Sequence, residues 1–457
     1  MNRRLRDLTG SLASFGWGLS LFALDQLGRA WRLAASGGDA DAAGAAAAAL
    51  SWAAHQQLGE ILGPVLGSAD RAQREMVNRV LAGRAAGIGA ELLADLAAFG
   101  ICLLPGQSSA FAWRELSNKL EVCWLAAERR EAAGRAGDLG DVGPGAGDHG
   151  GDGGSLATAV AAAYRREPFA VLFTLERLGR EAAVAALEAG DRGGPPRRLL
   201  AAAGGLPAAS LILLHTGMGM GFARRLLATA GPPGSPGALV RTLDRFVSLC
   251  RDNSVAGYEA AALEALGLVV RIRHPDMVAA VDRELRGIGQ ELPGLFWHGA
   301  GRALYFLPGQ LPPGAGSLPR QSRICRGEAP PDCWVDAASG LFYAAAMVNL
   351  RHPELLFDLF RSIGDQAQES EVFADAAAAA VLVRYATTPD DPALAALLAY
   401  RPERPAGAGS WERRLQASCE LALRDLYPLL AQRRRFGLLA RHRDLAELLG
   451  RLREDQG

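Results

Sequence analysis

Two histidines, His215 and His298, have the surroundings in the sequence that best suit chemistry. Each ends an apolar run and is followed by glycines two residues apart, namely Gly217 and Gly219, and Gly299 and Gly301. Imidazole titrates near neutral pH, so two histidines facing one cavity could act as a catalytic acid and base. An apolar run also suits a core histidine that is hydrogen-bonded to carbonyl groups. The sequence favours the core position and keeps the acid–base role as the alternative.

The glycines allow another group to approach the backbone closely. The first stretch contains GxGxG, but a dinucleotide-binding loop needs a preceding β-strand and a later acidic residue. No clear strand precedes it, and Arg224 and Arg225 follow it. Because glycine has no side chain, either a neighbouring helix or a flat apolar ligand could pack there. If a ligand binds, Arg224 or Arg302 could hold an anionic group such as a carboxylate.

Other polar residues are expected to serve structure. Glu176 and Arg180 have the i,i+4 spacing of a surface ion pair, and Glu259 and Glu264 are expected on a solvated helix face. His274 and His352 each precede a proline and are expected to cap helix starts. No HxxxH, HxH or CxxC spacing predicts a metal, and none of the six cysteines forms a disulfide or zinc pattern. We expect no cofactor.

Composition excludes several classes of protein. The 457 residues carry 49 basic and 49 acidic side chains, so no charge imbalance indicates binding to nucleic acid. Lys119 is the one lysine, and the arginine-rich usage indicates a GC-rich bacterial genome. Met1–Arg6 is basic and precedes an apolar run, but that run is too short to span a bilayer. We expect an amphipathic first helix, no membrane span and a cytoplasmic location.

Helical periodicity covers nearly the whole chain, and no alternation long enough for a sheet occurs. The sequence therefore predicts an all-α fold of repeated helical hairpins, solenoid-like or bundled. Arg-His-Pro-acid recurs 78 residues after position 273, and Leu-Pro recurs 86 residues after position 206, which indicates degenerate units of about 80 residues. Four regions are expected: N-terminal helices at 1–135, a flexible Gly/Asp-rich linker at 136–156, a repeat core at 157–402 and C-terminal helices at 403–457.

Aromatic residues near the glycines could form the wall of an apolar site, or simply core. The most prominent are Tyr305, Trp334 and Tyr343.

Three stretches resemble a bacterial family of unknown function that is encoded in gene clusters for enediyne polyketide antibiotics. The stretch from His215 to Arg224 resembles its H-V-G-x-G-W-A-x-A-R block, with Met220 in place of tryptophan. Residues 296–306 resemble F-D-Q-G-x-G-R-x-L-W-F, with Trp-His in place of Asp-Gln, and residues 332–344 resemble D-x-W-S-G-x-G-x-A-x-x-Y-A. The matched positions are Gly217, Gly219, Arg224, Gly299, Gly301, Arg302, Trp334 and Tyr343.

The resemblance implies an accessory protein of polyketide or other specialised metabolism. It would bind an apolar, polyunsaturated intermediate or dock a synthase. One alternative is an enzyme that uses His215 and His298 for proton transfer. Another is a helical-repeat adaptor that binds protein partners along a concave face.

Overall fold

The computed structural model describes six positions between Arg114 and Val122 and most of residues 153–454. The described positions before 123 are 114, 115, 118, 119, 121 and 122, and the gaps after 153 are 194, 202–204, 230–236, 308–316, 364–366, 404–406 and 443. The predicted first helix and almost all of regions 1–135 and 136–156 lie outside these residues. The chain divides into two compact units, Met1–Trp113 and Arg114–Gly457, and the second is the one described below. The predicted boundaries at 135, 156 and 402 stay predictions.

The prediction of an all-α fold is confirmed: the described residues form helices joined by turns, without a β-strand. The main helices, in chain order, are α5 (Gly153–Ala163), α6 (Pro168–Gly193), α7 (Leu211–Thr229), α8 (Ala238–Asn253), α9 (Glu259–Arg273), α10 (Val278–Ile288), α11 (Leu292–Leu304), α12 (Ser317–Glu328), α13 (Trp334–Asn349), α14 (Pro353–Ser362), α15 (Ala367–Thr387), α16 (Pro392–Ala399), α18 (Ala417–Leu421), α19 (Tyr427–Arg433) and α20 (Leu445–Glu454). Two π-helical segments, η4 (Trp411–Gln416) and η5 (Ala422–Leu426), flank α18, and a 3₁₀ segment, η6 (Phe436–Ala440), follows α19.

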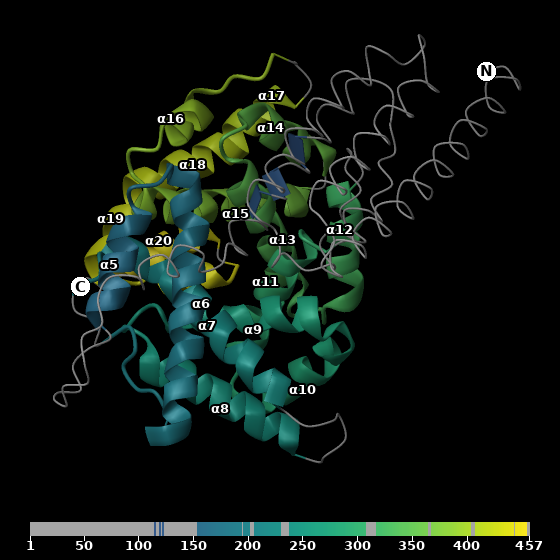
Figure 1. The fold of residues 1–457 in the computed structure, drawn as a ribbon. Helices are drawn as coiled ribbons and strands as arrows, with labels where there is room; N and C mark the ends of the chain where they lie inside the picture. The colour runs from purple at the N-terminus through teal and green to yellow at the C-terminus, as the bar shows by residue number, and fades with distance from the viewer. Residues whose placement is uncertain are drawn as a thin grey trace, which may run out of the picture. The chain divides into compact units, whose positions relative to one another are not determined.

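Five inner helices, α7, α9, α11, α13 and α15, pack side by side in chain order, and α6 packs against α7 (Figure 1). Helices α8, α10, α12 and α14 connect one inner helix to the next and pack around the outside. The inner helices are buried on nearly every face, whereas α8 and α10 bury a single apolar stripe. The C-terminal helices α18 and α19 cover α15. Along the chain, α7, α9, α11 and α13 are each followed by one outer helix, and a regular repeat of such helix pairs stays a prediction.

The spacing seen in the sequence spans two of these helix pairs. The Arg-His-Pro motif occurs once after α9 and once after α13, and these inner helices are two pairs apart in the chain. Both prolines occupy the first turn of a helix, where a missing N–H costs nothing. His274 and His352 hold the N-cap positions, but neither side chain makes a capping hydrogen bond. The predicted capping positions are therefore confirmed, and the backbone makes the cap: the carbonyl oxygen of His274 accepts from the N–H of Met277, and that of His352 accepts from the N–H groups of Leu355 and Leu356.

Glycines let the inner helices approach each other until their backbones touch. A Cβ added to Gly217 would lie 1.8 Å from the carbonyl oxygen of Glu176, and one added to Gly219 would lie 1.9 Å from that of Ala262. The same holds reciprocally for Gly267 and Gly299 between α9 and α11, and for Gly301 and Gly340 between α11 and α13. No side chain fits at such a crossing, so only glycine allows this separation. The glycines of both stretches serve helix packing.

Candidate functional site

The His215 side chain joins the turn between α8 and α9 to helix α7 through hydrogen bonds. Its Nδ1 lies 2.6 Å from the carbonyl oxygen of Leu211, one turn earlier, and its Nε2 accepts a 2.9 Å hydrogen bond from the backbone N–H of Val255. Tyr258 stacks on the ring at 5.3 Å. Because one nitrogen must donate and the other accept, the imidazole is the neutral Nδ1–H tautomer. Both nitrogens are engaged, so His215 has none left for a substrate.

Burial lowers the pKa of His215 to about 4, although its hydrogen bond to Leu211 favours the charged form. An unfolded histidine binds a proton near pH 6.5, so folding releases that proton between about pH 6.5 and 4, and the stability that His215 contributes is lost as the pH falls. We expect the stability difference between the native protein and His215→Leu to shrink by up to about 3 kcal/mol between pH 7 and pH 4. Urea unfolding of both proteins at each pH measures it. A difference independent of pH would show that His215 titrates normally in the folded state.

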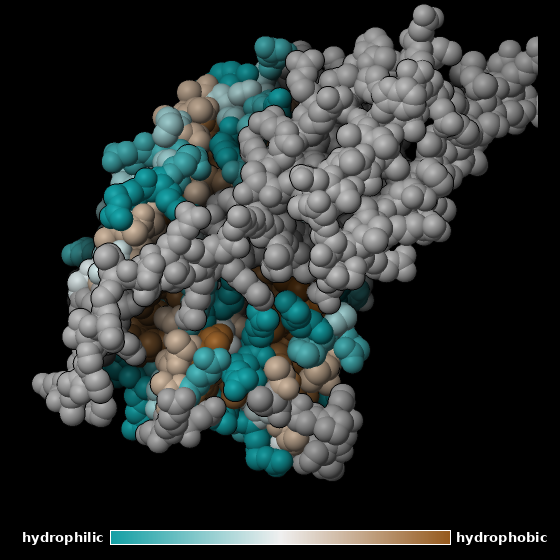
Figure 2. All heavy atoms as spheres, in the orientation of Figure 1, coloured by the Kyte–Doolittle hydropathy of each residue, from teal (hydrophilic) through white to brown (hydrophobic). Residues whose placement is uncertain are grey.

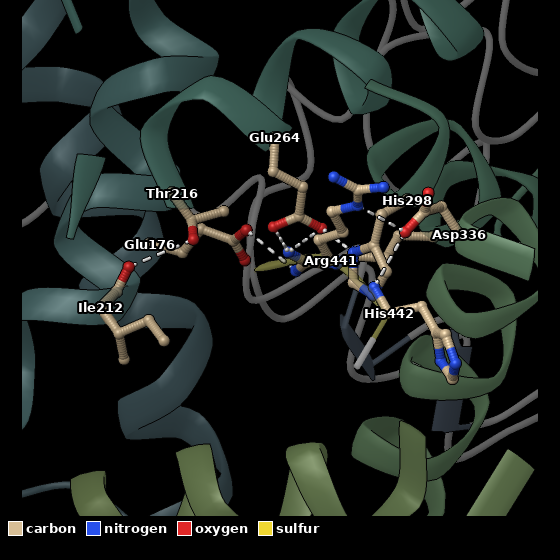
Figure 3. Close-up of polar contacts among 9 residues, drawn as sticks. Glu176, Ile212, Thr216, Glu264, His298, Asp336, Arg441 and His442 are labelled. Carbon is tan, nitrogen blue, oxygen red and sulfur yellow. Dashed lines mark hydrogen bonds and ion pairs between the residues drawn. The ribbon is translucent and has the colours of Figure 1, made fainter. Parts of the chain in front are cut away.

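His298 belongs to a separate, buried cluster of charged residues drawn from three helices. Its Nδ1 lies 2.8 Å from Oε1 of Glu264 on α9. Arg302, one turn further along α11, donates from Nη1 to both oxygens of Glu264 at 3.1 and 3.0 Å. Its Nη2 lies 3.6 Å from Oε1 of Glu176 on α6. Figure 3 shows Glu176, Glu264 and His298 directed toward one another.

The charges in this cluster are set by burial and by Arg302. Burial alone would raise the pKa of Glu264, but Arg302 and His298 hold it below the ordinary value, so Glu264 is ionised. Burial raises the pKa of Glu176, and Glu264 adds to this effect, while Arg302 and Arg180 oppose it. Burial would lower the pKa of Arg302, yet Glu264 and Glu176 raise it. Glu176 is therefore the carboxyl of this cluster that protonates more readily.

Helix α13 contributes an aromatic ring to the border of the cluster. The guanidinium carbon of Arg302 lies 5.1 Å from the centre of the Tyr343 ring on α13, and the His298 ring lies 5.9 Å from it. Burial raises the pKa of Tyr343, so its hydroxyl stays protonated. The structure thus brings together the predicted residues His298, Gly299, Gly301, Arg302 and Tyr343.

The other predicted site residues lie elsewhere. Arg224 is exposed on α7, and the guanidinium of Arg326 lies over the Trp334 ring at 4.1 Å. The Tyr305 hydroxyl donates to Glu115. Since Arg302 is engaged by two carboxylates, it offers no free charge to a substrate anion in this arrangement. Among the described residues, no three His, Cys, Asp or Glu side chains are grouped so as to hold a metal ion.

A cavity of about 430 Å³ opens at the N-terminal ends of α9 and α11, beneath η6. Its lining combines apolar and charged side chains: Arg251, Glu259, Ala260, Leu263, Glu291, Leu295, Gly437, Leu438 and Arg441. We call it the η6 groove. The apolar residues Leu263 and Leu295 come one residue before Glu264 and three residues before His298, respectively. The groove therefore lies within about one helical turn of the cluster along both helices.

Three hydrogen bonds hold η6 and the residues directly after it over the groove. The N–H of Gly437 donates to the carbonyl oxygen of Gly257 at 2.9 Å, where Gly257 has a φ of 88° that favours glycine. Nε of Arg441 donates to Oδ1 of Asp336 at 3.1 Å, and the N–H of His442 donates to the same oxygen at 3.1 Å (Figure 3). These bonds tie the segment after η6 to the start of α13.

Sequence reasoning missed Glu176 and Glu264 as members of the cluster. It placed Glu176 in a surface pair with Arg180 and Glu264 on a solvated face, whereas Glu264 is 2% exposed and the side chain of Glu176 15% exposed. The available signal was that Glu264 stands among Leu263, Leu266 and Leu268 in an apolar helix. Burying an acidic residue within such a run costs free energy unless its charge is paired with a counter-charge.

Comparison of the chain with protein-family models, with curated proteins and with solved structures found no match. Among the described helices, none is long and apolar enough to cross a lipid bilayer.

Proposed function

We propose that this chain is a bacterial, cytoplasmic accessory protein of specialised metabolism, related to polyketide or enediyne pathways, that holds an apolar, polyunsaturated intermediate. The observation that carries this proposal is the η6 groove, whose 430 Å³ exceeds the roughly 300 Å³ at which ligand pockets begin. Leu263, Leu295 and Leu438 offer apolar contacts to the body of such a ligand. Arg441 is engaged by Asp336, whereas Arg251 makes only an exposed 3.5 Å contact with Glu291, so Arg251 is the wall arginine that suits an acidic end group.

The alternative of an adaptor or a synthase-docking surface has less support. A docking face normally exposes an apolar patch of several hundred Å². Among the described residues, Ile272 is the large apolar side chain that is exposed, at 46%. Figure 2 shows hydrophilic residues over much of the coloured surface, with hydrophobic ones mainly in recesses. The described surface therefore favours a held ligand over a docked partner.

Binding of cis-parinaric acid, a fluorescent polyene carboxylate, tests the proposal. We expect saturable fluorescence enhancement with the native protein. We expect binding at least tenfold weaker in Leu438→Glu, because a carboxylate would then stand in the apolar wall of the groove.

Ile272→Glu is the matched control, since it places the same charge on an exposed apolar site outside the groove, and it should bind normally. The methyl ester should bind more weakly than the acid if Arg251 holds the head group. Equal binding by Leu438→Glu and the native protein would show that the ligand does not bind in the η6 groove.

One observation favours a second candidate, an acid–base enzyme that uses His298 but not His215. Glu264 holds Nδ1 of His298, and Nε2 has no hydrogen-bond partner among the described residues. A carboxylate-held imidazole is a common general base. Solvent-deuterium exchange into the α-carbon of a β-keto thioester, catalysed by the native protein and by His215→Leu but not by His298→Gln, would support it. Exchange that persists in His298→Gln would rule it out.

A further inference from the structure

The single lysine of the chain stands in a buried polar network. Of the 49 basic residues that are lysine or arginine, Lys119 alone is lysine, so an ammonium group at this position departs from the general arginine usage of the chain. Lys119 is 1% exposed, and its Nζ lies 2.9 Å from Oε1 of Glu115, which is fully buried. The same Nζ lies 3.8 Å from the centre of the Tyr305 ring. An ammonium placed over an aromatic face is an attractive arrangement.

The network continues into the C-terminal ends of two inner helices. The Tyr305 hydroxyl, directly after α11, donates to Oε1 of Glu115 at 3.0 Å. Asn349, the last residue of α13, donates from Nδ2 to that hydroxyl at 2.8 Å and accepts from Nδ2 of Asn118 at 2.9 Å. Burial and Glu115 raise the pKa of Tyr305, so its hydroxyl remains a donor. Helix C-termini carry partial negative charge, which favours a cation such as Lys119 beside them.

More exposed ion pairs border this network. Arg114 pairs with Glu354, and both side chains are about half exposed, while Glu121 pairs with Arg351. The described residues from Arg114 to Glu121 contact the helical core through hydrogen bonds, ion pairs and the ring contact between Lys119 and Tyr305, and Val122 adds one buried apolar side chain. One oxygen of Glu115, Oε2, has no hydrogen-bond partner among the described residues although it is buried. Water would satisfy these groups well once they were exposed, so separating the whole segment from the core costs less than separating an equal apolar surface.

We propose that Lys119, Glu115 and Asn118 form a releasable polar latch that holds the segment 114–122 on the ends of α11 and α13. The latch opens in a local step without unfolding of the helical core. Tyr305 lies three residues after Arg302 on the same chain segment, so opening removes support from the end of α11 that carries the charged cluster.

Acetylation of the full-length protein with N-hydroxysuccinimidyl acetate tests the latch, because Lys119 is the sole side-chain amine and peptide mapping separates it from the N-terminal amine. We expect Lys119 to be acetylated far more slowly than free lysine. Its acetylation rate should nevertheless be at least tenfold higher than the rate expected if the reagent reached it only in the globally unfolded protein. Below the unfolding transition, the rate should depend only weakly on urea.

Tyr305→Phe removes two hydrogen bonds of the latch and should raise the labelling rate at least fivefold relative to the global unfolding constant of the same variant. Tyr385→Phe is the matched control, since that tyrosine lies on α15 outside both the network and the charged cluster, and it should leave this ratio unchanged. Labelling that tracks global unfolding at every urea concentration would overturn the proposal. Labelling at the rate of free lysine, or no effect of Tyr305→Phe on the ratio, would also overturn it.

Discussion

Gly219→Ala is expected to destabilise the protein by about 3 kcal/mol or more, which is at or above the upper end for overpacked cores. The added methyl group would lie 1.9 Å from the carbonyl oxygen of Ala262 and 2.7 Å from its carbonyl carbon. Those atoms belong to the backbone of α9, so no side-chain rotation can relieve the clash. Helices α7 and α9 would have to separate, and the neighbouring crossings between α6 and α7 and between α9 and α11 would lose their fit.

Gly450→Ala is the control for this substitution. Gly450 lies in the middle of α20 with no atom within 4 Å of an added Cβ. Alanine is the better helix former, so this change should stabilise the protein by about 0.5–1 kcal/mol. Chemical denaturation of the three proteins measures both effects. If Gly219→Ala costs no more than about 1 kcal/mol, the inner helices are not in backbone contact, and the packing role of the glycines would have to be abandoned.

Arg302→Met is expected to cost about 3–5 kcal/mol near neutral pH, because it leaves Glu264 and Glu176 buried without their shared cation. Glu264 is 2% exposed and accepts two hydrogen bonds from Arg302 at 3.0–3.1 Å, beside its 2.8 Å contact with His298. The loss of the cation would raise the pKa of both carboxyl groups in the folded variant. Raised carboxyl pKa values favour the folded state at low pH, so the variant should recover part of its lost stability as the pH falls toward 5.

Two further variants separate this cause from a general packing defect. Arg302→Met combined with Glu264→Met and Glu176→Met replaces the buried charges with apolar groups of similar length and should regain most of the stability. Arg361→Met removes an arginine from a partly exposed pair with Asp358 and should cost only about 0–1 kcal/mol. Unfolding by urea at pH 7 and pH 5 provides the measurement. A triple variant as unstable as Arg302→Met would indicate that the buried charges themselves are needed for folding.

The helical class and the two breaks at Pro275 and Pro353 could be predicted from local sequence. Proline and glycine interrupt the helices at His274-Pro275 and His352-Pro353 for reasons of backbone geometry that act within a few residues. A spacing of about 80 residues is visible in the sequence as well, and the repeat that it indicates stays a prediction. The sequence also indicated that the glycine stretches permit a close approach.

The roles of the two histidines could not be distinguished from the sequence, because they depend on partners 34 to 40 residues away. His215 has its two nitrogens engaged by Leu211 and Val255, while His298 is held by Glu264. Because the two histidine–glycine stretches look alike in sequence, the sequence did not predict that the two histidines have different partners.

By itself, the sequence determined the all-α class and the two helix starts at Pro275 and Pro353, because both follow from periodicity and from residues next to each other in the chain. Only the tertiary structure decided which charges meet. Glu176, Glu264 and Arg302 come from three helices, and their pairing depends on how α6, α9 and α11 lie beside one another. That arrangement is set by glycine contacts such as Gly267 with Phe296, whose partners are far apart in sequence. A buried charge is stable only when such packing brings its counter-charge within reach. The spacing of residues along the chain does not predict which of them will meet in this way.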